Sequence, residues 1–492
     1  MGRILIPLPE LLLMLSFRLA NFQAPAWADQ TFAAAPLGDV RRSRRAADLA
    51  AAMAARPGLS IPALLDSPYD IKAAYTLLDR PEATPDALQQ PHRQAVRRRL
   101  ETPGQSFLIL EDTSEMTWPG NLPVAGLGPI GTGSQGLQGF LLHSGLVVAW
   151  PGSAAGQVRR PPLEVVGLAD QIYHVRQRRP ADEKKGYAYG RLSRLRESDL
   201  WSAMGRRLGA APDGVRWERV CDRGADIYEF IAACAALRHG FVIRAAQDRA
   251  VAGGGHLFAA AARAPAPGHC ELGLRARPGQ KARTARLTVA ATRVELRAPT
   301  LRSAQQKAQL PAMIALSVVR VFEPGPPAEA KKPLEWVLLT AAPIETFEQA
   351  LEVAVKYSAR WLIEEFHQAL KTGLGAERLQ LEKAERLFAA IAIMSLVALR
   401  LIDLREAVRI EPEAPAAQSG LAPLELAVLR VKLKRPIKTV REAALAVGRL
   451  GGHMNRKGDG LPGWHTLWVG MKKLHDIVQG VLLAQSIPKF GE

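Results

Sequence analysis

Phe107-Leu-Ile-Leu-Glu-Asp112 is a short apolar run that ends abruptly in two carboxylates. A run of this length and composition predicts a buried β-strand. Similar runs follow at residues 140–148, at 219–221 before Asp222, and at 241–243 before Arg244. Helical stretches lie between them, notably at 226–237, and strands that alternate with helices predict an α/β core.

Asp112 and Asp222 each end a predicted strand. In open α/β sheets, ligand-binding residues lie at the carboxyl ends of the strands. A single Asp in such a place is most often a cap or turn residue. Two of them, in a chain that also has a helix with polar and charged residues on one face, favour a shared site at one edge of the sheet.

The candidate helix is Tyr357-Ser-Ala-Arg360-Trp-Leu-Ile-Glu364-Glu-Phe-His-Gln-Ala-Leu-Lys371. On one continuous α-helix, at about 100° per residue, a phenol, two cations and a carboxylate fall on one narrow face. These residues are Tyr357, Arg360, Glu364 and Lys371. A face of this kind suits a site that holds a metal ion through the carboxylate and phosphates through the cations and the phenol.

The carboxylates Asp112, Asp222 and Glu364 are far apart in the sequence and can meet only through the fold. Hard cations such as Mg²⁺ take oxygen ligands and commonly share a few carboxylates with substrate phosphates. Two such ions, about 4 Å apart, can activate a nucleophile and stabilise the leaving oxygen of a displacement at phosphorus. We expect the neighbouring Glu111 and Glu365 to point elsewhere. His367 lies about 300° around the helix from Glu364 and could reach the edge of the site, but a surface or packing residue is the favoured interpretation.

The charge of the chain favours a polyanionic partner. Lys and Arg number 65 against 47 Asp and Glu, for a net charge of +18, which indicates nucleic acid before a membrane surface. A coding bias toward Arg and Ala is the alternative. Two Arg clusters in a predicted helical region strengthen the DNA-binding interpretation: Arg41, Arg42, Arg44 and Arg45, and Arg93, Arg97, Arg98 and Arg99.

The cysteines and the amino terminus bear on the compartment. Three cysteines without a CxxC pair predict neither a disulfide framework nor a structural zinc site, and fit a reducing cytoplasm. Residues 4–17 are apolar and precede Ala26-Trp-Ala28, as in a signal peptide, but Glu10 and two prolines interrupt the run. We expect an extension or a packing helix, no membrane span, and a buried helix at 388–399.

Composition shifts divide the chain into segments. Residues 246–334 alternate polar and apolar residues and predict a β-rich insertion. The expected organisation is a leader extension at 1–26, a helical DNA-end-binding domain at 27–100, a core in two parts at 101–245 and 335–408 around the insertion at 246–334, and a helical C-terminal dimerisation domain at 409–492.

Several motifs together resemble the bacterial DDE transposases of the insertion-sequence-four group, most closely the transposon-five type. They run from Trp27-Ala-Asp-Gln-Thr-Phe through Glu111-Asp-Thr-Ser and Cys221-Asp-Arg-Gly-Ala-Asp-Ile to Trp336-Val-Leu-Leu-Thr and Arg449-Leu-Gly-Gly. The most specific is Tyr-x2-Arg-x3-Glu-x6-Lys at 357–371. Leu362 and Gln368 depart from the pattern, since the family has basic residues there.

The resemblance implies an α/β fold with an RNase H-like mixed-sheet catalytic core and roles for single residues. Asp112, Asp222 and Glu364 would be the catalytic triad and would bind Mg²⁺, for which Mn²⁺ can substitute. Tyr357, Arg360 and Lys371 would bind phosphates, and Arg244 and Trp336 would grip a flipped base and its flanking backbone. Arg41, Arg42 and Arg45 match the segment that binds the transposon end.

The implied function is cut-and-paste transposition of DNA. The steps would be nicking at the transposon end, hairpin formation and opening, and strand transfer into target DNA, all without a covalent enzyme intermediate. The partners would be double-stranded DNA and a second copy of the chain, in the cytoplasm at the nucleoid, with no membrane. The alternatives are a catalytically silent or inhibitory DNA-binding remnant and, on the leader alone, an extracytoplasmic metal-dependent hydrolase.

Overall fold

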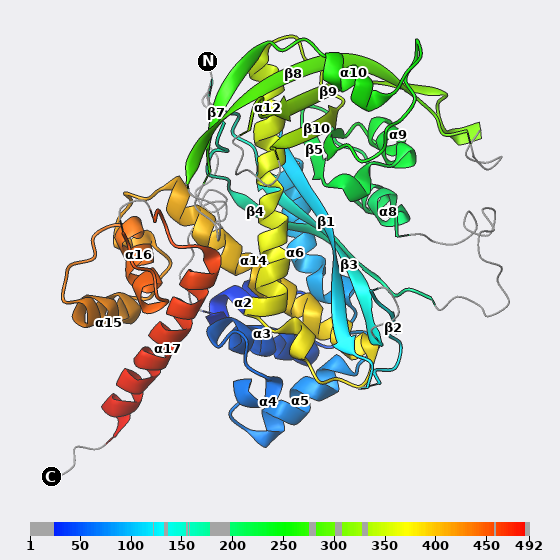
Figure 1. Cartoon of the computed structure of the whole chain (residues 1–492). Coiled ribbons are helices and arrows are strands. Elements are labelled where there is room, and N and C mark those ends of the chain that lie inside the picture. The colour runs from blue at the N-terminus through cyan, green and yellow to red at the C-terminus, as the bar shows by residue number, and fades with distance from the viewer. Residues whose placement is uncertain are drawn as a thin grey trace, which may run out of the picture.

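The computed structural model describes residues 24–487 apart from 122, 132–135, 154–155, 157, 178–196, 275–281, 301–307, 327–332 and 457–458. The apolar run at 4–17 therefore lies outside the described residues, as do parts of the β-rich insertion. Figure 1 shows a central sheet with helices packed on it and a group of C-terminal helices to one side.

Five strands form the centre of the sheet. They are β4 (Val165–His174), β3 (Leu137–Ala149), β1 (Ser106–Pro119), β5 (Arg216–Cys221) and β6 (Gly240–Arg244), adjacent in this order. β3 runs antiparallel to both of its neighbours, whereas β1, β5 and β6 run parallel to one another. Three antiparallel strands followed by two parallel ones make an RNase H-like core, and the predicted fold class is confirmed.

The β-rich insertion continues this sheet. β10 (Glu335–Thr340) pairs antiparallel with β6 and with β9 (Met313–Phe322), and β8 (Arg283–Arg297) and β7 (Gly268–Leu274) follow. With the short β2 (Gly128–Pro129) on β3 the sheet has ten strands. The short α10 (Leu257–Arg263) joins β6 to β7. The insertion therefore lengthens the core sheet.

Among the described residues, five helices lie between 24 and 100, where the sequence predicts a helical region. They are α2 (Ala24–Phe32), α3 (Val40–Ala55), α4 (Ile61–Leu64), α5 (Pro68–Leu78) and α6 (Pro85–Leu100). Each of α3, α5 and α6 begins after a residue whose side chain accepts a backbone N–H of the first turn. These residues are Asp39, Ser67 and Thr84. The Ala-rich face of α3 is buried, and its Leu49 belongs to the same apolar core as Leu108 of β1.

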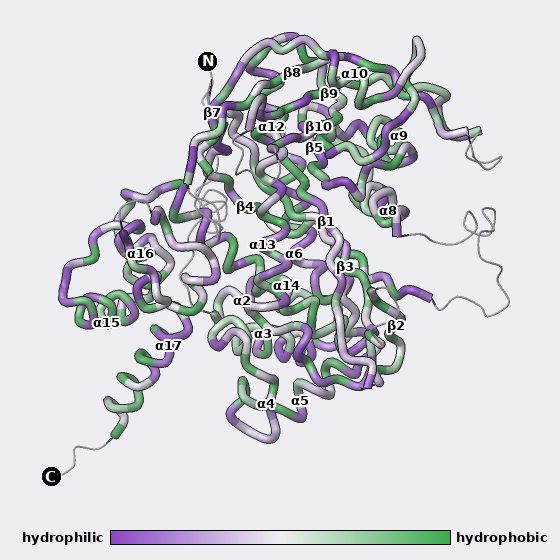
Figure 2. The backbone as a smooth tube through the Cα atoms, in the orientation of Figure 1, coloured by the Kyte–Doolittle hydropathy of each residue, from purple (hydrophilic) through white to green (hydrophobic). Residues whose placement is uncertain are grey.

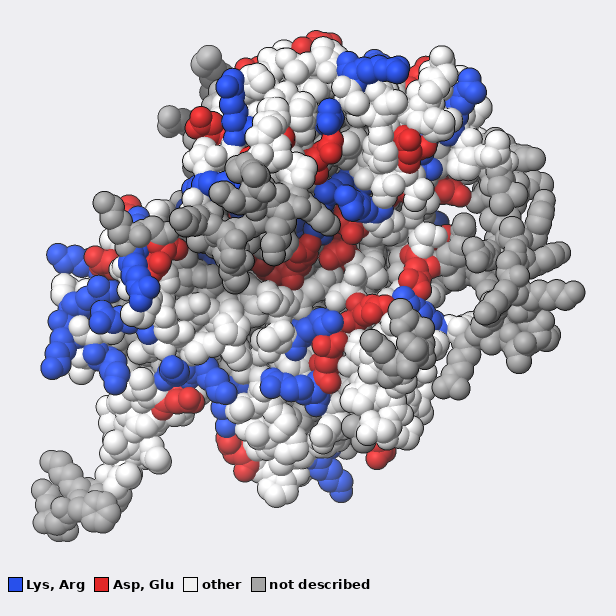
Figure 3. All heavy atoms as spheres, in the orientation of Figure 1, with Lys and Arg blue, Asp and Glu red and all other residues white. Residues whose placement is uncertain are grey.

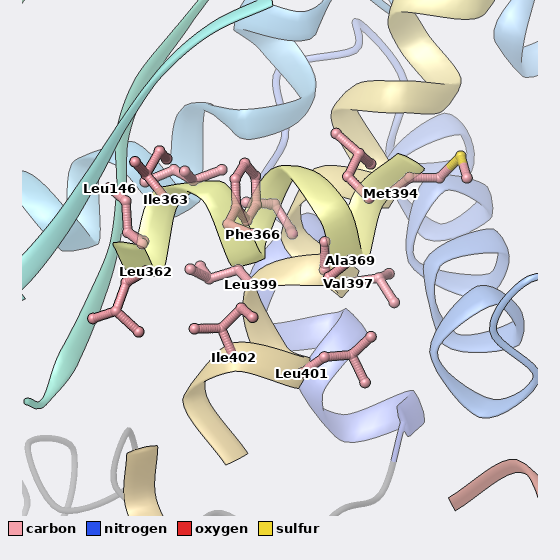
Figure 4. Close-up of a cluster of buried hydrophobic side chains, with 14 of the residues drawn as sticks. Leu146, Leu362, Ile363, Phe366, Ala369, Met394, Val397, Leu399, Leu401 and Ile402 are labelled. Atoms are coloured by element: carbon pink, nitrogen blue, oxygen red, sulfur yellow. The ribbon is translucent and has the colours of Figure 1, made fainter. Parts of the chain in front are cut away.

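α14 (Ala384–Ile410) lies at the centre of that core. It is long and apolar enough to cross a membrane by length and composition alone, but 82% of its most apolar stretch is buried inside the protein. In Figure 2 it is one of the apolar segments of the interior. Figure 4 shows Phe366 gathered with Leu399 and Ile402 of α14. The buried helix predicted at 388–399 is part of α14.

The remaining helices flank the sheet and end the chain. α8 (Asp199–Leu208) and α9 (Tyr228–Ala236) pack into apolar clusters with β5 and β6 on the face opposite α14. α12 (Phe347–Ala359) and α13 (Trp361–Gln368) precede α14. α15 (Pro423–Leu433), α16 (Val440–Leu450) and α17 (Trp464–Ser486) share an apolar cluster of their own.

Candidate active site

Asp112 and Asp222 lie side by side on two parallel strands. The parallel pairing of β1 and β5 ends at Glu111 opposite Cys221, so the next residue of each strand is one of the two aspartates. Asp112 is not at a strand end as predicted, because β1 continues to Pro119 along β3 and Asp112 is paired there with Ser144. The parallel partner of β1 stops at this point, which leaves one side of Asp112 open toward Asp222.

The electrostatics of the two carboxylates differ. Burial and the nearby charge of Asp112 raise the pKa of Asp222, although its carboxylate accepts the backbone N–H of Gly224 at 2.8 Å. Burial would also raise the pKa of Asp112, but His367 and Arg360 hold it below its usual value. Two acids that repel each other in a partly buried place favour a cation between or beside them.

Glu364 comes to this place from the helical side. The predicted continuous helix is interrupted: α12 ends at Ala359, α13 begins at Trp361, and a π-helical turn, Ala369–Gly373, follows α13. Glu364 forms an ion pair with Arg360. The charge of Arg360 also acts on Asp112 and Asp222, so this guanidinium is the common neighbour of all three carboxylates.

The donor set has the chemistry of a site for Mg²⁺, which prefers oxygen ligands and few protein carboxylates. In the part of the chain that the structure describes, however, no three His, Cys, Asp or Glu side chains are close enough to one another to hold a metal ion. The place is a negatively charged cluster whose present counter-ion is Arg360. It fits a divalent cation by ligand type, provided that Glu364 leaves Arg360 for it.

Two further predicted residues gather around Arg360. Its guanidinium lies 5.8 Å from the centre of the Tyr357 ring. Burial raises the pKa of Tyr357, and both Arg360 and Arg244 act against that rise. Arg244, at the end of β6, donates to the Glu335 carbonyl at 3.2 Å, one residue from Trp336. Trp336 is half-buried on β10 and packs against the main core.

Lys371 lies in the π-helical turn, where the α-helical spacing used in its prediction no longer holds. Its Nζ donates to the Glu115 carbonyl of β1 at 2.8 Å and lies 3.1 Å from Glu377. The turn is thereby tied to β1 three residues beyond Asp112. Single π-helical turns inside helices occur frequently at functional sites.

The Arg residues of α3 are held within the N-terminal helices. Arg41 pairs with Asp39 at 3.2 Å, Arg42 with Glu82 at 2.8 Å, and Arg45 donates to the Tyr69 hydroxyl at 3.2 Å. Arg41 remains 84% exposed. No contact with the carboxylate cluster is recorded for these three among the described residues, so any role in DNA binding belongs to a separate surface.

His367 contacts the cluster, although the sequence analysis favoured a surface or packing role over a place at the edge of the site. It is buried, its Nδ1 lies 3.7 Å from the Asp112 carboxylate, and its Nε2 lies 3.2 Å from the Ser144 hydroxyl. It stands three residues after Glu364, on the same side of a helix, and that spacing was the available signal. Interpretation of His367 as a surface or packing residue was therefore incomplete.

A buried chain of hydrogen bonds leads away from His367. The Ser144 hydroxyl accepts a hydrogen bond from the side-chain amide of Gln171 at 3.0 Å. The side-chain oxygen of Gln171, Oε1, accepts one from the Gln89 amide at 2.7 Å. Gln89 lies on α6 and donates as well to the Ala392 carbonyl of α14 at 3.0 Å. All these side chains are buried. The chain joins the N-terminal helices, two sheet strands and α13.

Glu111 and Glu365 point away from the cluster, as expected. Glu111 is fully buried and binds Arg219 through both carboxylate oxygens, with His143 at 3.3 Å. Glu365 forms an ion pair with Arg405 of α14. Both acids are already paired, which leaves Asp112, Asp222 and Glu364 as the acids that share Arg360.

Two family models match the chain. Residues 24–83 match "Transposase DNA-binding", and residues 220–400 match "Transposase DDE domain". The second range contains Asp222 and Glu364 and begins after Asp112. The chain thus carries a transposase DNA-binding domain and a DDE transposase domain, and the two matches support a DNA transposase.

Among solved structures, one similar chain is described as "Cryo-EM structure of piggyBac transposase synaptic complex with hairpin DNA". The identity is 9% and the TM-score 0.33, with 98% of this chain and 82% of that chain covered. This overall likeness is weak. The assignment of the core rests on the strand order and on the two family matches.

Proposed function

We propose that this DDE transposase is a cut-and-paste enzyme of the insertion-sequence-four group, closest to the transposon-five type, with Asp112, Asp222 and Glu364 as its catalytic carboxylates. The observation that carries the proposal is their convergence on Arg360 from β1, β5 and α13. Asp112 on β1 and Asp222 just after β5 each follow the last paired residues of the two parallel strands. The motif Tyr-x2-Arg-x3-Glu-x6-Lys supports the group assignment.

The three carboxylates would hold Mg²⁺, or Mn²⁺ in its place. A bound divalent cation would supply charge stabilisation at phosphorus and a more acidic water. The chain's own part is to gather the acids, to exclude Glu111 and Glu365 from them, and to keep His367 against Asp112. Each proposed step is the same displacement at phosphorus, with a water or a DNA 3′-hydroxyl as the nucleophile.

The proposed order is nicking at the transposon end, attack of the freed 3′-hydroxyl on the opposite strand to make a hairpin, opening of the hairpin, and strand transfer into target DNA. Tyr357, Arg360 and Arg244 form one electropositive group beside the carboxylates and suit phosphate oxygens. Lys371, in the π-helical turn, would add a further phosphate contact. Trp336 has an aromatic face that suits stacking with a base taken out of the duplex.

The segment boundaries from the sequence remain part of the proposal. Helices α2–α6 would bind the transposon end through Arg41, Arg42 and Arg45, and the segment from 409 would pair two copies of the chain on two ends. The protein would act in the cytoplasm, at the nucleoid, on double-stranded DNA.

The direct test is cleavage of DNA that carries the element's own inverted-repeat ends. We expect Mg²⁺-dependent nicking by the purified chain and a loss of at least about 100-fold for Asp112→Asn and for Glu364→Gln, because each removes a charge from the cluster. Glu115→Gln is the matched control, an exposed acid on the same strand, and we expect it to nick within a few-fold of the parent.

Binding of the same ends, measured without metal, separates the two candidate functions. End binding together with cleavage supports the active enzyme. End binding by a parent chain that cuts nothing would support the silent or inhibitory alternative. An Asp112→Asn variant that nicks as fast as the parent would contradict the site assignment.

A further inference from the structure

The C-terminal helices carry a concentrated group of exposed cations. Seven lie within twenty residues, from the end of α15 to the end of α16, and all are exposed. We call them the basic face: Arg430, Lys432, Lys434, Arg435, Lys438, Arg441 and Arg449. Figure 3 shows Lys and Arg side chains gathered over α15 and α16 at the left of the molecule.

In the described part of the chain, the members of the basic face lack recorded acid partners, unlike many Arg side chains of the core. Many Arg side chains elsewhere are matched to acids, as Arg207 is to Asp170 and Arg160 to Glu406. Within the described residues no ion pair is recorded for any member of the basic face. The one acid of the segment, Glu442, accepts the backbone N–H groups of Lys438 and Thr439 as part of the cap of α16.

Helix dipoles do not account for the whole group. Arg430 and Lys432 lie in the last turn of α15 and Arg449 in the last turn of α16, where cations are favourable. Arg441, however, is the second residue of α16, at the end of a helix where a cation is unfavourable. The remaining cations lie in the connection between the helices. Unmatched like charges in one place repel one another, so their position favours an anionic partner.

The residue types indicate what kind of anion. Between positions 430 and 449 there is no Asn or Gln, the side chains that recognise adenine edges in the major groove. Exposed Lys and Arg on flexible stems suit phosphates, whose positions do not depend on sequence. A row of them over two helices and their connection matches the repeated charges of a duplex backbone better than a single anionic group.

We propose that the basic face binds the backbone of target DNA, the duplex that receives the transposon, without reading its sequence. The naming of this duplex as target rests on the proposed function. The binding itself does not, because it needs only the exposed cations. The face is separate from the carboxylate cluster and from α3, so that one chain could hold an end and a second duplex together.

The test is the salt dependence of binding to a duplex that lacks the inverted repeats, measured by fluorescence anisotropy on the full chain without metal. The variant is Lys432→Gln/Arg435→Gln/Lys438→Gln/Arg441→Gln. Each phosphate contact contributes about 0.9 to the slope of log affinity against log salt. We expect the slope to fall by about 2 to 4 and the affinity at moderate salt to fall at least tenfold.

A charge-matched control removes four exposed cations of the core and the insertion: Arg206→Gln/Arg216→Gln/Arg263→Gln/Arg286→Gln. It should leave the slope within about 1 of the parent. Equal losses in both variants would mean that binding follows net charge, and would overturn the proposal. If the fourfold variant does not fold by circular dichroism, Lys432→Gln/Lys438→Gln gives the same comparison with half the effect.

Two further readouts separate the partners and the proposals. A change of oligomeric state in sedimentation, with an unchanged DNA slope, would assign the face to a second copy of the chain and overturn the proposal. In an active preparation the fourfold variant should nick ends at the parental rate and transfer strands at least tenfold more slowly. If the chain cuts nothing, the proposed function fails, and the anisotropy result still decides the binding.

Discussion

His92 joins the N-terminal helices to the sheet through one buried hydrogen bond. Its Nε2 accepts the backbone N–H of Leu168 at 3.0 Å, which requires a neutral ring. Burial, with a smaller contribution from Arg93, lowers the pKa of His92 from 6.5 to about 4. Between pH 6.5 and pH 4, His92 is protonated in the unfolded chain and neutral in the folded chain. The stability that His92 confers is therefore complete above pH 6.5 and is lost as the pH falls toward 4.

We therefore predict that acid weakens the parent more than a His92→Gln variant, which keeps an acceptor but does not titrate. Over this range the contribution is about 3 kcal/mol. Urea unfolding at pH 7.5 and at pH 4.5 measures it. His239, whose pKa burial also lowers to about 4, is present in both proteins and cancels in the comparison. Equal acid losses in the two proteins would remove His92 as a cause.

Single residues also mark how far the sequence could predict the site. Asp112 and Asp222 could be found because an apolar run that stops at an acid is a local signal. The helical spacing of His367 from Glu364 allowed a place at the edge of the site, but its contact with Asp112 depends on how α13 packs against β1 and β3. The predicted direction of Lys371 assumed a helix without the π-helical turn.

At the scale of elements, β4 shows why one strand was not predicted. Its sequence, VVGLADQIYH, places Asp170 and Gln171 in the middle of a buried strand. Burial of such groups is costly unless they are paired. Asp170 is paired with Arg93 and Arg207, and Gln171 with Ser144 and Gln89. Because these partners come from other segments of the chain, the hydrophobic pattern of residues 165–174 alone does not reveal the buried strand.

The turn after the catalytic helix depends on one glycine. Gly375 has a φ of +71°, in the left-handed region, and leads from the π-helical turn to Ala376–Arg378. A Cβ there would lie 2.4 Å from a terminal nitrogen of Arg378, a flexible group that can move, so the backbone conformation is the main cost. We predict that Gly375→Ala lowers the free energy of unfolding by about 1 to 2 kcal/mol.

The matched control is Gly480→Ala, in the middle of α17, where a Cβ meets nothing within 4 Å. This change should stabilise by about 0.5 to 1 kcal/mol, because alanine is the better helix former. Thermal or urea unfolding of both variants measures the pair. A Gly375→Ala protein as stable as the parent would show that the turn has no strict need of glycine.

At the scale of the whole molecule, the described residues form several buried apolar clusters, and two of them involve the N-terminal and the C-terminal helices. The main core runs from Phe32 of α2 through β1 to α14, so the N-terminal helices and the sheet share it. α15, α16 and most of α17 pack around Leu429 and Leu474 in a second group. The N-terminal boundary near residue 100, drawn from the sequence, therefore divides a continuous core.

We predict two transitions in calorimetry, one for the N-terminal helices with the sheet and one for the C-terminal helices. Leu49→Ala should destabilise the unit of the first transition and Leu429→Ala the unit of the second. Each change should lower the free energy of unfolding of its unit by about 2 to 5 kcal/mol, because both side chains are buried. If both variants shift the same transition, the molecule unfolds as one unit.

The buried chain of hydrogen bonds from Gln89 through Gln171 and Ser144 to His367 limits which substitutions these four positions can accept independently of one another. A buried polar group left without its partner costs about 1 to 3 kcal/mol, so a substitution at one of these positions favours a compensating substitution at the next. The N-terminal helices are therefore not a freely interchangeable module. A chimera with α6 from a relative would have to import the matching residues of β3 and β4 to keep the imidazole beside Asp112 in place.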